Sequence, residues 1–322
     1  MNTQVILGGI AAGAVILGAA GATIGAATLF NKVIPRQDGV KVDLDEMADA
    51  QKWEEYKKII YPNKEYLLSL PMEHVTIQSK DGLTLHGDYV PAESATNKLA
   101  ICFHGYTSNG MGNCACIASF FHKQGIDCLI VDHRAHGKSE GQYIGFGVLD
   151  RYDCISWINY VNQRFNEEKQ ILLFGTSMGG ATVLMASGLP DFPSTVKAVI
   201  ADCAFTSPED VFTHILKRDY KLPKFPVMNI NNMICRHKAG YGFGDCSTLD
   251  AVKSAKCPIL FIHGKEDDFV PTWMSEKNYA ACTAPKKLLI MENAGHGGSH
   301  YENPELYEKT VKDFLNTYYV TV

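Results

Sequence analysis

The chain is predicted to fold as an α/β protein with a mostly parallel sheet that helices cover on both faces. Two features of the sequence support this fold. The turn Lys80-Asp81-Gly82 predicts a hairpin, and short, continuous apolar runs then alternate with longer segments of helical periodicity. The 322 residues are 46% hydrophobic and 20% charged, a composition that can bury a large core and excludes a disordered chain.

The individual elements follow from these patterns. The hairpin strands are expected at residues 74–79 and 83–90, and the later strands at residues 99–103, 126–131, 171–174, 196–201, 258–262 and 287–291. Helices are expected at residues 113–124, 150–165, 178–188, 273–283 and 304–319. Before the hairpin, an amphipathic helix is expected at residues 43–60, ending at Tyr61-Pro62, and a second short helix at residues 64–69.

The N-terminal segment is uncharged from residue 5 to residue 30. As a helix rising about 1.5 Å per residue, this run could cross a bilayer core of about 30 Å. Lys32, Arg36 and Lys41 follow the run, so the positive-inside rule predicts that the rest of the chain lies in the cytoplasm. We therefore expect residues 1–31 to be a retained membrane anchor. The alternative is a cleaved secretory signal peptide, although the first residues lack its basic region.

Charge and cysteine content exclude several classes of protein. Lys+Arg 30 against Asp+Glu 35 gives a net charge of −5, which lacks the basic footprint of a general nucleic-acid binder. Several of the ten cysteines lie inside apolar, strand-like runs, where thiols pack as small hydrophobic side chains, and they do not suggest a disulfide framework. Cys114-x-Cys116 and His133-x-x-His136 are too sparse to predict a metal site.

The pentapeptide Gly-Thr-Ser-Met-Gly at residues 175–179 joins a predicted strand to a predicted helix. In this context Gly-x-Ser-x-Gly predicts a sharp turn that exposes the hydroxyl of Ser177 at the carboxyl edge of the sheet. A nucleophilic serine also needs donors for the oxyanion of the reaction intermediate. His-Gly-Tyr-Thr at residues 104–107 follows another strand, so the backbone N–H groups of Tyr106 and Met178 are candidates for that role.

The order nucleophile, acid, histidine along the chain selects the remaining candidates. His296 follows the last predicted strand by a short loop and is the expected base. His300 is its rival, and it is expected to lie at the surface or behind the site. Three carboxylates follow predicted strands and could orient the base: Asp202, Asp267 and Asp268.

These motifs make the chain from residue 74 onward similar to α/β-hydrolases. It resembles the bacterial carboxylesterase and acylaminoacyl-peptidase-like branch, which includes the cinnamoyl esterases. The matching pieces are His-Gly-Tyr-Thr at 104–107, Asp-His-Arg-Ala-His-Gly-Lys-Ser at 132–139, Gly-Thr-Ser-Met-Gly at 175–179, His-Gly-x-x-Asp-x-x-Val-Pro at 263–271 and Gly-His at 295–296. Ala135 departs from the usual Arg-Gly-His-Gly, which affects inferences about the pocket more than those about catalysis.

The resemblance implies a mechanism. Ser177 attacks an acyl carbon, His296 takes and returns the proton, and Asp267 orients the imidazole, with no metal or organic cofactor. The spacing of His-Gly-x-x-Asp-x-x-Val-Pro selects Asp267 over its two rivals. The expected reaction is hydrolysis of a carboxylic ester in a small-molecule substrate. Peptidase or thioesterase activity with the same triad and a non-catalytic binding role are the alternatives, and the oligomeric state is left open.

The resemblance also implies the domain organisation. An α/β-hydrolase domain is expected at residues 74–322, with a cap insert at about 206–250 and a linker with helices at 32–73. Asp132 and Arg134 are expected to pair and to support a loop under the site. Between residues 211 and 240 the chain carries six basic residues against one acid. This excess could be a solvated surface, or it could face anionic lipid or receive acidic substrates close to the anchor.

Overall fold

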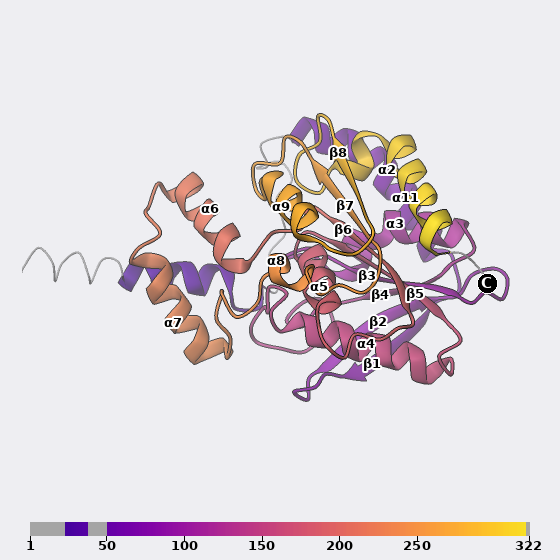
Figure 1. Ribbon diagram of the computed structural model, residues 1–322, viewed down its shortest axis with the longest axis horizontal. Helices are drawn as coiled ribbons and strands as arrows, with labels where there is room; N and C mark the ends of the chain where they lie inside the picture. Colours follow the sequence, from indigo (N-terminus) through magenta and orange to yellow (C-terminus); the bar gives the residue numbers. More distant parts are fainter. Residues whose placement is uncertain (1–22, 38–49, 320–322) are drawn as a thin grey trace, which may run out of the picture.

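The computed structural model describes residues 23–37 and 50–319, and within them eight strands form one sheet (Figure 1). The strands are β1 Glu73–Gln78, β2 Thr84–Val90, β3 Lys98–Phe103, β4 Asp127–Val131, β5 Gln170–Thr176, β6 Val196–Asp202, β7 Ile259–Gly264 and β8 Lys286–Met291. They lie in the order β1-β2-β4-β3-β5-β6-β7-β8. The pairs β1–β2 and β2–β4 are antiparallel and the later pairs are parallel, so the predicted mostly parallel sheet is confirmed.

Helices cover both faces of this sheet. They are α2 Ala50–Leu68, α3 Gly110–Lys123, α4 Asp150–Arg164, α5 Met178–Ser187, α6 Pro208–Tyr220, α7 Val227–Ala239, α8 Thr248–Ala251, α9 Trp273–Ala281, α10 Ser299–Glu302 and α11 Pro304–Tyr318. α4, α5, α8 and α9 lie on one face, while α2, α3 and α11 lie on the other (Figure 1). The arrangement is the α/β-hydrolase fold that the sequence predicted.

The central strands are apolar throughout because both of their faces are buried. In β3, Leu99 and Ile101 belong to the apolar cluster under α4 and α5, whereas Ala100 and Cys102 belong to the cluster under α3 and α11. All four side chains are fully buried. The strands therefore form a rigid platform, and the loops at their carboxyl ends carry the predicted site residues.

Helix α2 runs through a proline where the sequence predicted a break. One helix spans residues 50–68 with Pro62 inside it, so the predicted end was wrong. The first part of the expected helix, residues 43–49, lies outside the described residues. A proline inside a helix removes one backbone donor and costs about 3 kcal/mol or more. Packing against α3 offsets this cost, as where Ser119 Oγ donates to Asn63 Oδ1 at 2.9 Å.

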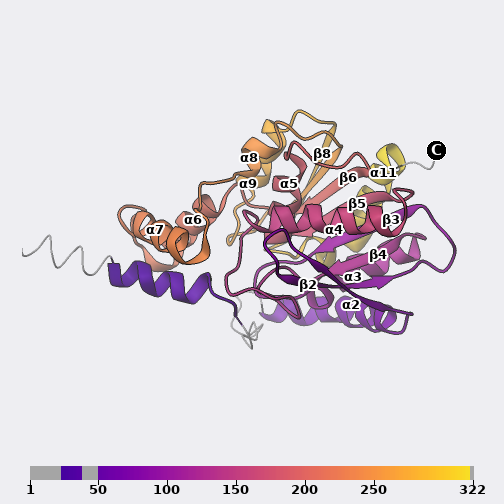
Figure 2. The ribbon, with the colours of Figure 1, turned by 90° about the horizontal axis from the view of Figure 1, so that it is seen from below.

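Helices α6 and α7 form a cap at one end of the molecule (Figures 1 and 2). A helix at residues 23–33 lies beside them in both views. Ala26 and Phe30 on this helix, and Ile34 just after it, are buried with cap residues in a third apolar cluster. The cap region is therefore built from two distant parts of the chain.

The expected membrane anchor at residues 1–31 lies outside the described residues, except for its last part. Within the part of the chain that the structure describes, no helix combines the length and the apolar character that crossing a bilayer requires. Residues 23–31 pack against the cap, so this end of the predicted anchor contacts protein.

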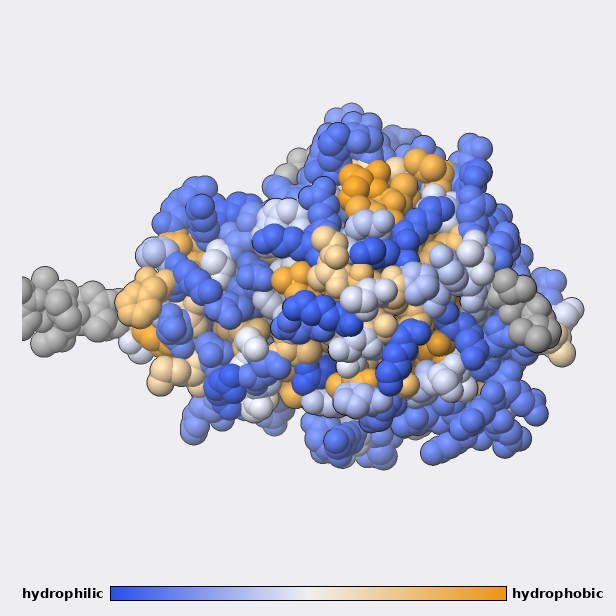
Figure 3. Space-filling view, viewed as in Figure 1, coloured by the Kyte–Doolittle hydropathy of each residue, from blue (hydrophilic) through white to orange (hydrophobic). Residues whose placement is uncertain are grey.

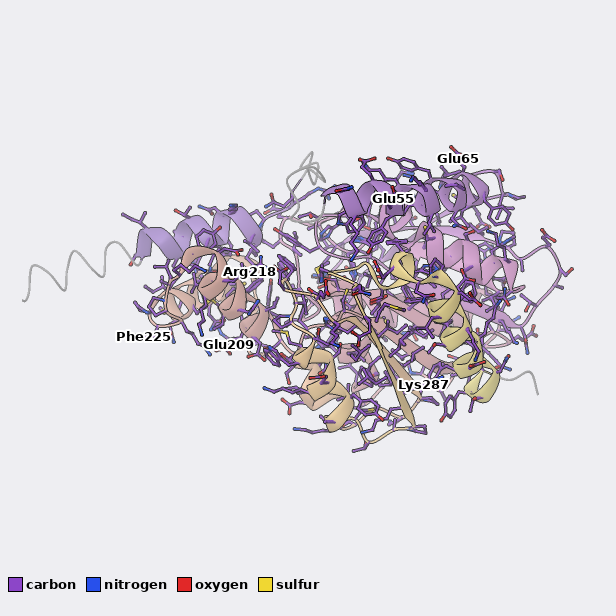
Figure 4. All side chains as sticks on the ribbon, turned by 90° about the horizontal axis from the view of Figure 1, so that it is seen from above. Glu55, Glu65, Glu209, Arg218, Phe225 and Lys287 are labelled. Atoms are coloured by element: carbon purple, nitrogen blue, oxygen red, sulfur yellow. The ribbon has the colours of Figure 1, made fainter. Side chains whose placement is uncertain are left out.

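The outer surface of the cap region carries exposed apolar side chains (Figure 3). Ile24, Phe225 and Met233 are 68%, 73% and 69% exposed. Figure 4 shows Phe225 at the outer end of the cap, with Arg218 nearer the body of the molecule. By contrast, the outward face of α2 carries charged side chains of both signs: Glu55 and Glu65 are labelled in the same view, and Glu55 pairs with the exposed Lys58. Large exposed apolar side chains thus gather on the cap region, and Figure 3 shows further apolar surface on the body of the molecule.

Candidate active site

Ser177 stands on a sharp turn between β5 and α5. Its backbone has φ 55° and ψ −113°, a strained conformation for a residue with a side chain. The flanking glycines are required by space: a Cβ on Gly175 would lie 2.2 Å from Gly179 O, and one on Gly179 would lie 2.2 Å from Phe103 O. The turn that Gly-x-Ser-x-Gly predicted is present, and it brings the start of α5 against the end of β3.

The structure brings Ser177, His296 and Asp267 together from three loops. His296 Nε2 lies 2.9 Å from Ser177 Oγ, and His296 Nδ1 lies 2.7 Å from Asp267 Oδ2. The three residues follow β5, β8 and β7, which end at the same edge of the sheet. Because the carboxylate of Asp267 accepts, His296 carries its proton on Nδ1, and Nε2 is free to accept the hydroxyl proton of Ser177.

Asp267 is held as a carboxylate by four donors. Its Oδ1 accepts the backbone N–H groups of Phe269 at 3.0 Å and Val270 at 2.8 Å. Its Oδ2 accepts from His296 and lies 3.1 Å from Nε2 of His263, a buried histidine that also donates to Val270 O at 2.7 Å. Burial works to raise the pKa of Asp267, but the interaction with His296 and the hydrogen bonds from both histidines outweigh burial and hold that pKa well below its usual value.

The three rivals have other partners. Asp202 is buried behind the site and accepts from Tyr307 Oη at 3.0 Å, and burial raises its pKa to about 6. Asp268 is on the loop surface, where Arg218 donates to its carbonyl oxygen at 2.7 Å. His300 stacks on Tyr307 with ring centroids 4.5 Å apart. The backbone carbonyl of Asp202 accepts the N–H of Ser177 at 2.7 Å, but within the described residues no side chain of the three rivals forms a hydrogen bond to Ser177 or His296.

The electrostatics of His296 suit a proton carrier. Burial works to lower its pKa, but the adjacent Asp267 carboxylate outweighs burial and raises that pKa above the usual value of an imidazole. An imidazolium formed during a reaction would therefore be stabilised where it forms. The Ser177 side chain, at 7% exposure, is nearly withdrawn from solvent, which strengthens these interactions.

The loop after β3 lies against Ser177. A Cβ on Gly105 would lie 3.5 Å from Ser177 Cβ, so the next residue, Tyr106, is at the site. Met178 is the first residue of α5, and its N–H belongs to the first turn, where helical N–H groups have no partner within the helix. The two predicted oxyanion donors thus belong to segments that flank the serine, and their catalytic role stays a prediction.

Buried histidines hold this loop, a role that was not predicted from the sequence. His104 Nε2 accepts the N–H of His133 at 3.0 Å, and His136 Nε2 accepts the N–H of Thr107 at 3.3 Å. Burial and the neighbouring histidines lower the pKa of His136 to about 4 and the pKa of His104 well below its usual value, so both rings are neutral at pH 7. The motif His133-x-x-His136 was the only hint of this role in the sequence, and its spacing alone does not show that the histidines bind the loop after β3.

Arg134 does not pair with Asp132, so that expectation was wrong. Arg134 donates from Nε to Asp153 at 2.6 Å and from both terminal nitrogens to Asp81 at 2.9 Å. Asp132 instead accepts the backbone N–H groups of Gly110 and Lys138, both at 2.8 Å. The reason is that an aspartate at a strand end is positioned to bind the amides of adjacent loops, whereas the arginine reaches across to carboxylates on α4 and on the hairpin.

Two groups of three metal-type ligand residues occur within the described residues. His74, His86 and Asp88 lie on the β1–β2 hairpin, and Cys203, Asp267 and His296 lie at the site. In the second group, hydrogen bonds already engage His296 and Asp267. All ten cysteines are free thiols, and burial raises the pKa of Cys203.

Ser177 borders a cavity of about 230 Å³ beneath the cap. Most of its lining is apolar and comes from the cap, from Phe146 and Phe243, and from the N-terminal segment through Leu29 and Val33. Leu29 was expected in a membrane anchor and Val33 in a linker, so this last contribution was not predicted.

Comparison with known proteins gives the family. The sequence profile of the prolyl oligopeptidase family matches residues 135–320, more than half of the chain. The chain belongs to this family. YqkD, an uncharacterised protein of Bacillus subtilis, is 32% identical over 240 residues, which cover 74% of this chain and 78% of that protein.

Solved structures agree on the fold. The esterase Pf2001 of Pyrococcus furiosus superposes with a TM-score of 0.62 at 24% identity, over 78% of this chain and 92% of that chain. Est1E of Butyrivibrio proteoclasticus, solved with ferulic acid bound, superposes with a TM-score of 0.57 at 20% identity, over 76% and 98% of the two chains. The predicted resemblance to α/β-hydrolases is confirmed, and the fold is of the serine hydrolase type.

Proposed function

We propose that this protein is a serine hydrolase that cleaves carboxylic esters through an acyl-enzyme. The observation that carries the proposal is the chain of hydrogen bonds from Ser177 Oγ to His296 Nε2, at 2.9 Å, and from His296 Nδ1 to Asp267 Oδ2, at 2.7 Å. A serine on a strained turn at a sheet edge, in contact with a base that a carboxylate orients, is the arrangement that activates a serine hydroxyl.

We assign each step of the proposed reaction to a residue of the site. His296 takes the proton of Ser177 Oγ as the oxygen attacks the ester carbonyl carbon, and Asp267 stabilises the imidazolium. The N–H groups of Tyr106 and Met178 donate to the oxyanion of the tetrahedral intermediate. His296 then gives its proton to the departing alkoxide, and the acyl group stays on Ser177. Water, deprotonated by His296, hydrolyses the acyl-enzyme and restores the serine.

Labelling with a fluorophosphonate probe tests the proposal. We expect the purified full chain to react at one serine, and Ser177→Ala to abolish both labelling and hydrolysis of p-nitrophenyl esters. Ser194→Ala is the matched control, because Ser194 is exposed and precedes β6, at the opposite end of the parallel strands from the triad. Labelling that persists in Ser177→Ala would refute the nucleophile assignment, and a folded wild type that is never labelled would favour a non-catalytic role.

A peptidase is the second candidate, and the name of the matching family supports it. The same triad can cleave esters, thioesters and amides, so only the rates decide. Values of kcat/KM for an ester, a thioester and an aminoacyl amide with the same acyl group would separate the alternatives. Faster cleavage of the amide than of the ester would replace the ester proposal.

We also propose that the chain is attached to a membrane with the hydrolase domain in the cytoplasm. Residues 5–22 contain no charge, and 18 residues at about 1.5 Å each would give a helix of about 27 Å. The exposed Phe225 and Met233 on the cap are suited to contact lipid. Removal of the first 30 residues as a signal peptide would also remove Leu29, which lines the cavity, and this favours retention.

Reporter fusions at the C-terminus and N-terminal sequencing of the mature protein test this topology. A mature protein that lacks residues 1–30, or a reporter that is active only outside the membrane, would contradict it.

A further inference from the structure

The cavity beside Ser177 is walled by two parts of the chain that lie far apart in the sequence. The cap supplies Phe212 and Ile215, and the N-terminal segment supplies Leu29, Val33 and Ile34. Without these N-terminal side chains, one wall of the cavity would be open. The N-terminal segment, residues 29–36, is therefore a structural part of the site.

Hydrogen bonds fix the N-terminal segment in this position. Tyr106 Oη donates to Val33 O at 3.2 Å, and Ile144 N donates to Ile34 O at 2.8 Å. Arg36 N donates to Gln142 O at 2.8 Å, and the Arg36 guanidinium donates to two further carbonyl groups. The first of these bonds joins the segment to Tyr106, whose backbone N–H is a predicted oxyanion donor. The N-terminal segment is therefore connected to the reacting end of the cavity as well as to its wall.

Apart from the buried Asn231, Ser177 and two tyrosines, the uncharged lining of the cavity is apolar, which suits a hydrocarbon chain. Phe146, Phe212 and Phe243 are buried and stack edge to face, with ring centroids 4.7 and 4.9 Å apart. The charged residues of the lining, Lys32 and Asp219, are exposed, so they stand at the mouth. Such a site gains binding energy from apolar surface that leaves water.

We propose that the cavity binds the aliphatic acyl chain of the substrate ester, and that Leu29 and Val33 of the N-terminal segment set the chain length it accepts. The inference rests on the proposed function, because it names the acyl group that Ser177 would receive. It makes the substrates esters of aliphatic acids longer than acetate.

A series of p-nitrophenyl esters from acetate to decanoate measures the site directly. Each methylene that enters the cavity should raise kcat/KM about fourfold, equivalent to about 0.8 kcal/mol, until the cavity is full. Beyond that length kcat/KM should level off or fall. Each rate is divided by the concentration of fluorophosphonate-titrated sites, so that misfolded protein does not enter the comparison.

Two opposite substitutions at one position test the wall. Leu29→Trp fills part of the cavity and should lower the octanoate-to-acetate ratio of kcat/KM at least tenfold. Leu29→Ala enlarges the cavity and should move the optimum to longer chains. Asn31→Trp is the matched control, because it places the same indole on the exposed side of the same helix and should leave the ratio unchanged.

The outcomes separate this inference from the proposed function. If Ser177 is labelled and esters are cleaved, but neither Leu29 variant changes the chain-length profile, the N-terminal segment does not wall the acyl site. A wild-type profile that is flat from acetate to octanoate would overturn the acyl-chain assignment as well. Absence of labelling and of ester hydrolysis in folded protein would refute the proposed function itself.

Discussion

Replacing Asp267 by asparagine should nearly abolish activity while the fold survives. The substitution keeps the shape of the side chain and removes one buried charge, whose nearest partner is His296 Nδ1 at 2.7 Å. Two unit charges about 4 Å apart interact by about 4 kcal/mol at an effective dielectric constant of about 20. That energy stabilises the imidazolium in the transition state, so its loss should lower kcat about 10³-fold.

The pH profile gives a second, independent readout of the same change. Asp267 raises the pKa of His296, and only the neutral imidazole can accept the serine proton. In the wild type the acid limb of kcat/KM should therefore have its midpoint above about pH 6.5, the usual value for histidine. Without the carboxylate the pKa of His296 falls, so in Asp267→Asn the acid limb should move to lower pH even as the maximal rate drops.

Steady-state kinetics of ester hydrolysis from pH 5 to pH 9 would measure both effects, with urea denaturation to confirm folding. Asp202→Asn and Asp268→Asn are matched controls that should keep most of the activity, because neither residue hydrogen-bonds to His296. If Asp267→Asn kept more than a tenth of wild-type kcat, or if Asp202→Asn were the folded and inactive variant, the acid assignment would be wrong.

Three further predictions concern stability and the cap. Burial lowers the pKa of His136 to about 4, against about 6.5 in the unfolded chain, so the unfolded state binds the proton first and the free energy of unfolding decreases as the pH falls. Urea denaturation should show that His136 accounts for about 2 kcal/mol of this decrease by pH 5. An equally large decrease in folded His136→Asn would contradict the prediction. Asn231 Oδ1 is buried in the cavity wall without a hydrogen-bond partner among the described residues, so Asn231→Leu should raise the free energy of unfolding by about 1 kcal/mol or more, and a loss of stability would count against the reasoning. Lys217→Glu with Lys221→Glu should weaken binding of a protein beginning at residue 23 to anionic vesicles about 30-fold or more, and unchanged binding would leave the basic cap as a solvated surface.

The basic excess of the cap is smaller in the structure than in the sequence. Arg218 pairs with Asp219, while Lys224 pairs with Glu209 and Arg236 with Asp245. Asp219 lies within residues 211–240, the stretch with six basic residues against one acid, whereas Glu209 and Asp245 lie outside it. Within the described residues, Lys217, Lys221 and Lys238 have no carboxylate partner, and the proposed contact with anionic lipid rests on them.

The fold and the three site residues could be predicted because their signals are local. A buried parallel strand is apolar along its whole length, and each strand end carries a short motif that needs only its own neighbours. Asp267 could be selected over Asp202 because the spacing from His263 is fixed by one loop. The structure brings these residues within hydrogen-bonding distance, and their catalytic roles await the variants above.

The features that could not be predicted depend on contacts between distant segments. The carboxylates that bind Arg134 are Asp81 on the hairpin and Asp153 on α4, and no pattern in either segment points to the other. Pro62 lies inside a helix because α3 packs on that helix, and local propensity alone predicted a break. In the first case a distant segment offered a partner that the adjacent sequence does not contain, and in the second tertiary packing outweighed a local preference of about 3 kcal/mol or more.

The N-terminal run contains a boundary that hydropathy alone does not mark. Residues 5–30 are all uncharged, so hydropathy alone treats them as one segment, yet Ala26, Phe30 and Ile34 are buried in protein at four-residue steps. Thr28 and Asn31, between them, are exposed. A helix that faces lipid all round has no reason to place its polar residues on one side, whereas a helix that packs on protein does. The appearance of polar residues on one side of the run, at Thr28 and Asn31, is therefore the signal in the sequence that this part of the chain packs on the cap.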